Sequence, residues 1–159
     1  MDHVVIMQPE HLQARDGRPR VTVAVEARDR PGPAFKQGVY PDDVVWIRMG
    51  PLLVARATVK IAWKGEYAFI RELRDRTKGS ELQHDDDFWQ GKPKIGYAVV
   101  ATLQNARFLP EPALAGPRTY GYDWVVVEND RKRETWLTKR PPEPKDAPLV
   151  ERFNELVSS

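Results

Sequence analysis

The sequence predicts an α+β fold, a small, mixed but mainly antiparallel β-barrel with one or two packed helices and a C-terminal helix. Three observations support this prediction. Short apolar or alternating segments recur close together along the 159 residues, Pro and Gly separate them, and the chain ends in an apolar stripe at helical spacing. Many short strands favour closure into a barrel, because closure buries the edges of a sheet.

The first half of the chain predicts four strands. Residues 4–7 are a brief apolar run typical of a buried strand, and residues 20–26 alternate as a half-buried strand does. The prolines and glycines of residues 29–41 predict an irregular, exposed loop. Residues 43–49 and 52–63 are apolar and rich in β-branched side chains, and the Gly-Pro pair between them predicts a hairpin.

The second half begins with a change of period. Apolar residues recur at helical spacing in residues 66–78, and Gly79 is placed to end that helix as a C-terminal cap. Residues 95–103 and 122–128 return to a strand pattern. Residues 134–138 are predicted to form a short last strand.

The C-terminal segment has its own composition. We expect residues 1–140 to form the barrel domain and residues 141–159 to form a Pro-rich connector and a helix docked on the barrel. Asp146 and Pro148 suit the start of this helix. Its apolar stripe predicts that Phe153 is buried against the barrel; the stripe comprises Leu149, Val150, Phe153, Leu156 and Val157.

Composition excludes several kinds of chemistry. The chain has no cysteine, which excludes disulfides, thiol nucleophiles and cysteine-ligated zinc. His84 with the three aspartates that follow it is the one metal-like grouping, but acidic runs in loops are usually solvated, so we predict no metal and no cofactor. The sequence has neither a long apolar run nor a leader pattern, and this predicts a cytoplasmic protein without a membrane partner.

Several segments resemble the PUA-like superfamily, especially its ASCH and EVE branches. Residues 42–48 are similar to a turn and strand that those families begin with Gly-Asp, although Asp42 stands in place of the glycine. Residues 54–59 are similar to the following strand. Residues 97–110 resemble the ASCH strand that ends in an aromatic residue and a proline, and residues 122–127 resemble the closing strand of EVE-like modules.

The resemblance implies a cleft that holds a nucleotide, either single-stranded RNA or a flipped and modified base of RNA or DNA. A nuclease or helicase is a further candidate partner. Some ASCH relatives are hydrolases that use a lysine, a threonine and a glutamate. Thr22 could supply that threonine and Glu26 the general base, but Arg20 occupies the nearest basic position. A guanidinium stays charged and cannot act as nucleophile or base, which weakens the hydrolase interpretation.

Tryptophans and arginines are the candidate ligand-binding residues, because aromatic faces stack on bases and arginine reads their edges. Trp46 and Arg48 lie two apart on one predicted strand and should share a face, which we expect to line the principal concavity. Trp89 follows Phe88 in a predicted loop. The other candidates are Arg20, Arg118, Tyr120, Tyr122 and Trp124.

The net charge of +2 does not identify a nucleic-acid binder, but basic residues gather at residues 15–20 and 131–133, which could form one surface. The favoured function is therefore a module that binds single-stranded RNA or an extruded base without chemistry of its own. One alternative is an ASCH-type hydrolase of a modified nucleoside or RNA. The other is a protein-interaction domain that uses the Pro-rich tail and terminal helix.

Overall fold

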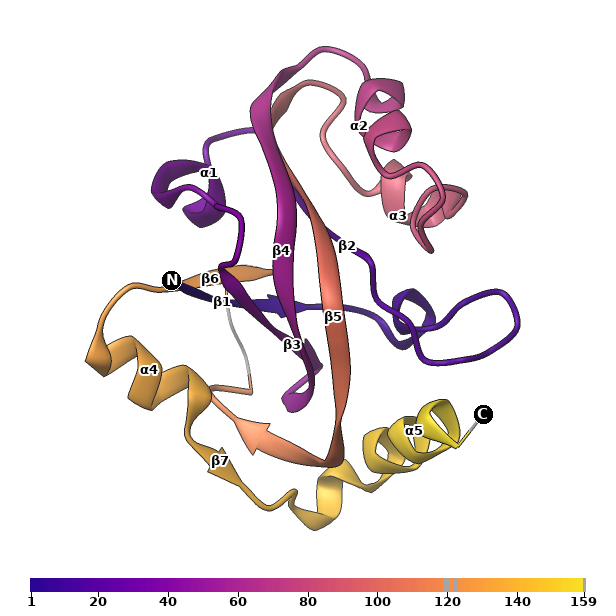
Figure 1. Ribbon diagram of the computed structural model, residues 1–159, viewed down its shortest axis with the longest axis vertical. Coiled ribbons are helices and arrows are strands. Elements are labelled where there is room, and N and C mark those ends of the chain that lie inside the picture. Colours follow the sequence, from indigo (N-terminus) through magenta and orange to yellow (C-terminus); the bar gives the residue numbers. More distant parts are fainter. Residues whose placement is uncertain (119–120, 122, 159) are drawn as a thin grey trace.

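A computed structural model describes residues 1–118, 121 and 123–158 of the chain. Within these residues all the strands belong to one mixed sheet, shown in Figure 1. The strands are β1 (Asp2–Ile6), β2 (Val23–Arg28), β3 (Val44–Met49), β4 (Leu52–Tyr67), β5 (Gly96–Ala115), β6 (Trp124–Val127) and β7 (Lys139–Arg140).

The order of strands is β2-β5-β4-β3-β1-β6, with β7 paired to the far end of β5. Only β1 and β3 run parallel among the described pairs. The predicted single mixed and mainly antiparallel sheet is therefore confirmed. Its complete closure is not, because β2 and β6 end the series without pairing to each other. The result is a curled half-barrel with a gap between two edges.

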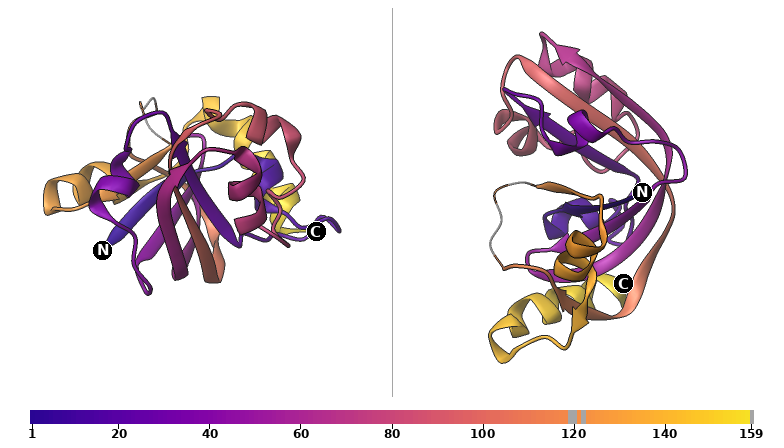
Figure 2. Two further views of the ribbon diagram at one scale, coloured as in Figure 1. Left: turned by 90° about the horizontal axis from the view of Figure 1, so that it is seen from above. Right: turned by 90° about the vertical axis from the view of Figure 1, so that its left-hand side faces the viewer.

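The long β4–β5 hairpin produces this shape. β2 pairs with the half of β5 near Tyr97, whereas β3 pairs with the opposite half of β4, from Leu52 to Thr58. The β4–β5 register shifts at three points, and such irregularities bend strands and increase their twist. Figure 2 shows both strands curving along one side of the molecule in the right-hand view. The two edges therefore face each other across the molecule.

The turn before β3 holds Asp42 in an unusual backbone conformation. Asp42 has a φ of +72°, in the left-handed region where glycine is favoured and aspartate is among the better tolerated alternatives. The next carboxylate, that of Asp43, accepts a hydrogen bond from the Tyr40 amide at 3.0 Å. Asp42 therefore adopts a backbone conformation that glycine most often supplies.

The helices differ most from the sequence prediction. Residues 134–138 are not a strand but part of α4, because Asn129 caps a helix there by accepting a hydrogen bond from the Lys132 amide at 2.8 Å. The predicted 29–41 loop contains the short α1, and the 66–78 segment divides between β4 and α2. The helices are α1 (Pro33–Gln37), α2 (Ile70–Arg76), α3 (Asp86–Gln90), α4 (Asp130–Leu137), α5 (Ala147–Val157), and the 3-10 turns η1 (Pro9–Leu12) and η2 (Pro144–Asp146).

Both faces of the sheet are covered. The main core lies inside the half-barrel, and Phe153 and Leu156 of α5 are buried in it, as the stripe predicted. A second cluster packs β2 and the adjoining half of β5 against α2 and α3, and a third packs β1 and β6 against α4. No helix within the described ranges has the length and apolar character to cross a bilayer.

Candidate functional site

A cavity of about 200 Å³ lies where the half-barrel fails to close, between β2 and the end of β1. Its inner wall is apolar, and polar groups stand around it. The lining residues are Val5, Ile6, Met7, Gln8, His11, Ala24, Val25, Leu82, Phe88, Lys92 and Asp123. We call it the gap cavity. A smaller opening of about 30 Å³ shares Val25, Lys92 and Asp123 with it, so Lys92 borders both spaces.

Lys92 is the most distinctive polar group of the gap cavity. Its ammonium nitrogen lies 4.6 Å from the centre of the Phe88 ring, a cation–π distance. Among the described residues the Lys92 ammonium group makes no hydrogen bond or ion pair. Burial lowers the pKa of Lys92, and the negative charges of Asp123 and Glu26 oppose this shift only in part. Lys92 is thus a desolvated donor available to a ligand.

The position of Phe88 is fixed by its neighbours. Asp85 caps α3, accepting a hydrogen bond from the Phe88 amide at 3.1 Å. The other oxygen of Asp85 is hydrogen-bonded to His11 Nε2. The His11 ring meets the Phe88 ring edge to face at 5.3 Å. This connection between η1 and α3 holds an aromatic wall in place before any ligand arrives.

The hydrolase candidates do not meet in one site. Arg20 and Thr22 line a small groove beside α2, whereas Glu26 borders the small opening. Both oxygens of Glu26 accept hydrogen bonds at 3.2 Å from the first amides of α1. Burial raises the pKa of Glu26, and these hydrogen bonds partly oppose the shift. Glu26 therefore holds α1 in place. The carboxylate that contacts Thr22 is Glu81, which the sequence did not indicate.

Trp46 and Arg48 share a face as predicted, but α4 packs on that face. The Arg48 side chain is fully buried, and its guanidinium donates to the carbonyl oxygens of Gly50 at 3.1 Å and Pro117 at 2.6 Å. The Trp46 indole N–H donates to Asp2. Neither residue lines the gap cavity or the two grooves. The Trp46–Arg48 face does not line any of these concavities because Trp136 and Leu137 of α4 cover it.

Trp89, Trp124 and Arg118 are also absent from the lining of the gap cavity. Trp89 lies on α3, not in a loop, and its buried indole donates to the Leu82 carbonyl at 2.8 Å. Trp124 is buried, borders only the small opening, and donates to His3 Nδ1 at 3.1 Å. Arg118 forms a two-pronged ion pair with Asp146. Tyr120 and Tyr122 lie outside the described residues.

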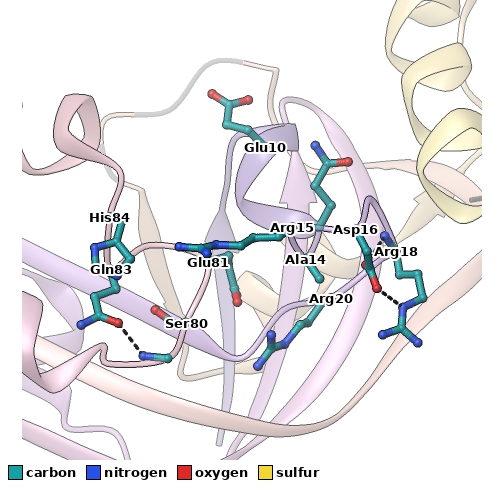
Figure 3. A pocket seen from close by; sticks show the side chains of 12 residues that line it. Glu10, Ala14, Arg15, Asp16, Arg18, Arg20, Ser80, Glu81, Gln83 and His84 are labelled. Carbon is teal, nitrogen blue, oxygen red and sulfur yellow. Dashed lines mark hydrogen bonds and ion pairs between the residues drawn. The ribbon is translucent and has the colours of Figure 1, made fainter.

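A larger concavity, a groove of about 670 Å³, lies beside the gap cavity and is drawn in Figure 3. Residues 10–20 form one side of this groove and residues 79–84 the other. Arg20, a predicted ligand-binding residue, lines it together with Arg15 and Arg18. His84 also lines it. Among the described residues, no group of histidines and carboxylates is arranged to hold a metal ion.

Sequence reasoning missed most of the gap cavity. Lys92 is a single lysine after Gly91, and Asp123 stands before a strand, so neither belongs to a motif. His11 showed no partner at a recognisable spacing, because Asp85 is 74 residues away along the chain. The Phe88-Trp89 pair is the one part of the cavity wall near which the sequence predicted a binding residue, Trp89. The helical phase of α3 then decides which of the two rings reaches the cavity.

Comparison with known proteins gives structural likenesses. The ASCH protein from Zymomonas mobilis is 15% identical and superposes on 99% of this chain and 94% of its own, with a TM-score of 0.48. The N-terminal domain of Staphylothermus marinus McrB is 11% identical over 94% of this chain and 92% of its own, with a TM-score of 0.46. No family model matches the sequence, and no curated protein matches it.

Proposed function

We propose that this protein binds nucleic acid by accepting one unpaired base into the gap cavity. The observation that carries the proposal is the pairing of a fixed aromatic wall, Phe88, with the desolvated donor Lys92 in a cavity at an open sheet edge. A cavity of about 200 Å³ is below the usual range of about 300–1,000 Å³ for small-molecule pockets. Its size therefore suits one planar ring better than a larger ligand.

The residues have complementary tasks in this proposal. The base packs against Phe88 and the apolar inner wall, which supplies affinity without selecting a sequence. Lys92 donates to a carbonyl oxygen or ring nitrogen of the base. Asp123, at the rim, can accept from an exocyclic amine or ring N–H. Because a base inside a duplex cannot reach such a cavity, the ligand is a single strand or a flipped nucleotide.

The test is a binding screen with labelled single-stranded RNA, single-stranded DNA, and duplex DNA with and without methylated bases. We expect Lys92→Gln to lower the affinity for the preferred ligand at least 10-fold, because Lys92 is the donor inside the cavity. The matched control is Lys94→Gln, two residues away on an exposed side chain. Equal affinity of the two folded variants would contradict the proposal. It would also be contradicted if the wild-type protein bound none of the nucleic acids in the screen.

A second candidate function is hydrolysis, and one contact favours it. The Thr22 hydroxyl donates to Glu81 at 2.8 Å at the edge of the small groove. A hydroxyl next to a carboxylate base is the minimal arrangement for an activated nucleophile. We expect hydrolysis of an acylated nucleoside or RNA, if it occurs, to be lost in both Thr22→Val and Glu81→Gln. Wild-type protein without hydrolytic activity would leave binding as the function.

A further inference from the structure

The large groove carries basic groups that the gap cavity does not use. Arg15 and Arg20 line it with exposed side chains, and neither guanidinium group forms a hydrogen bond or ion pair with another described residue. In Figure 3 the Arg15 side chain extends across the groove in the direction of His84, while Arg20 points into the groove from the segment that leads to β2. Two guanidinium groups are therefore available in one concavity.

The acidic residues of the groove do not pair with Arg15 or Arg20. Asp16 accepts from Arg18 Nε at 2.7 Å and from the Arg18 amide at 3.1 Å, so these two charges offset each other. Both oxygens of Glu81 accept from Thr22 at 2.8 Å. The Glu10 carboxylate points away from Arg15 and Arg20 in Figure 3. The guanidinium groups of Arg15 and Arg20 are therefore left in the groove without an acidic partner.

The groove has a neighbouring concavity on each side. Arg20, Gly79 and Ser80 line the adjoining small groove as well, where Lys78 adds another exposed positive charge. On the other side, Glu10 and Gln83 of the groove are the sequence neighbours of His11 and Leu82, which line the gap cavity. The His11–Leu82 wall thus separates the cavity from the groove. A polymer held in the cavity would need to cross only this wall to reach Arg15.

We propose that the groove is a phosphate-binding site in which Arg15 and Arg20 bind phosphate oxygens of the strand next to the base in the gap cavity. This inference rests on the proposed function, because it assumes that the ligand is a nucleic acid. A guanidinium presents a planar fork of donors that matches two phosphate oxygens, and it stays charged at any physiological pH. The ligand then carries at least one phosphate group, which an isolated nucleoside lacks.

The first experiment measures the affinity of single-stranded 10-mers of DNA and RNA against NaCl concentration for Arg15→Gln, Arg20→Gln and the double variant. Each lost contact should reduce the slope of log affinity against log salt by about 0.7, so the double variant should lose about 1.4. The charge-matched control is Arg131→Gln on α4, which Figures 1 and 2 place on the far side of the molecule from residues 13–20. Slopes of the double variant equal to those of the control would overturn the proposal.

The second experiment separates the groove from the gap cavity by comparing 10-mers with and without a 5′-phosphate, and free nucleosides. If the Arg15→Gln and Arg20→Gln variants lose affinity only for the 5′-phosphorylated 10-mer, the groove binds a terminal phosphate. If they lose affinity for both 10-mers, the groove binds the phosphodiester backbone. Nucleoside binding should be unchanged in the arginine variants and reduced in Lys92→Gln. If nucleosides fail to bind but the double variant still loses salt dependence, the base-binding function fails and the phosphate site stands.

Discussion

The rings of Phe88 and Trp89 lie 4.9 Å apart between centroids and nearly perpendicular, at 88°, yet they face different environments. Phe88 is partly exposed and lines the gap cavity, whereas Trp89 is 2% exposed and packs in the cluster beneath α2 and α3. One turn of helix, capped by Asp85, sets this division. Two neighbouring aromatic residues therefore occupy different places, Phe88 in the wall of the gap cavity and Trp89 in the buried cluster.

Phe88→Ala is expected to leave the protein folded and to weaken ligand binding by about 1–3 kcal/mol, the cost of losing one aromatic contact to a base. Trp89→Ala is the matched comparison, and it should lower the free energy of unfolding by about 3–5 kcal/mol because it leaves a large cavity in the core. Urea titration and ligand titration of the two variants measure these effects. If Trp89→Ala weakened binding and Phe88→Ala lowered the free energy of unfolding instead, the binding surface would lie on the Trp89 side of α3 and not in the gap cavity.

A buried histidine predicts that stability falls in mild acid. His3 is fully buried, and Trp124 donates its indole N–H to Nδ1, so Nε2 carries the proton that is donated to Asp43 at 2.9 Å. Burial lowers the pKa of His3 below its ordinary value of 6.5, and the hydrogen bond and charge of Asp43 reverse only part of this shift. A second proton would sit on Nδ1, directly opposite the indole donor.

The sign follows from these states. Above about pH 7 neither the folded nor the unfolded His3 is protonated, and stability is constant with respect to this group. As pH falls below 6.5 the unfolded chain binds a proton that the folded chain refuses, so the free energy of unfolding decreases by up to about 1.4 kcal/mol per pH unit until the lowered pKa is reached. Urea midpoints at pH 7.5, 6 and 5 should show this, and His3→Phe should flatten the change. An unchanged pH dependence in that variant would contradict the assignment.

The strands that depend on local pattern were predicted well. Residues 43–49 and 52–63 form a hairpin, as the Gly-Pro pair indicated, because pattern and turn chemistry agree there. β2 shows the limit of this approach. Val21 belongs to the inner core while Val23 and Val25 belong to the cluster under α2 and α3, because the regular strand begins only at Val23 and both of its faces are buried.

The candidate site could not be predicted because it is made by contacts distant in the chain. The gap exists only because β1 inserts beside β3 and leaves β6 at the edge opposite β2, a pairing without a local signal. The basic clusters at residues 15–20 and 131–133 do not form one surface, since Figures 1 and 2 place α4 on the opposite side from the first cluster. Trp46 and Arg48 matched a binding pattern, but α4, which was predicted as a strand, supplies the Trp136 ring beneath Arg48.

The docking of α5 predicts a further stability effect. Phe153 has no exposed surface and packs in the main core. Phe153→Ala should therefore reduce the free energy of unfolding by about 3–5 kcal/mol, measured by urea denaturation. The matched control is Val157→Ala, because Val157 lies on the same helix but is 37% exposed. A loss below about 1 kcal/mol for Phe153→Ala would show that α5 does not contribute to the core.

The last prediction concerns the ion pair that ties residue 118 to the start of α5. Arg118 donates to both oxygens of Asp146, at 2.6 and 3.0 Å, and Asp146 also accepts from the Glu143 amide at 2.8 Å. The Arg118 guanidinium is the largest cause that holds the pKa of Asp146 at about 2, against an ordinary 3.8. The stability that this pair contributes is present above the ordinary pKa of 3.8 and is lost as pH falls through about 2.

Arg118→Met should raise the pKa of Asp146 toward 3.8, measured by NMR titration of its carboxyl carbon. Arg152→Met is the control, because Arg152 pairs with Glu155 at 3.9 Å and does not contact Asp146. If the pKa of Asp146 stays near 2 in Arg118→Met, the hydrogen bond from the Glu143 amide, and not the guanidinium, controls this carboxylate.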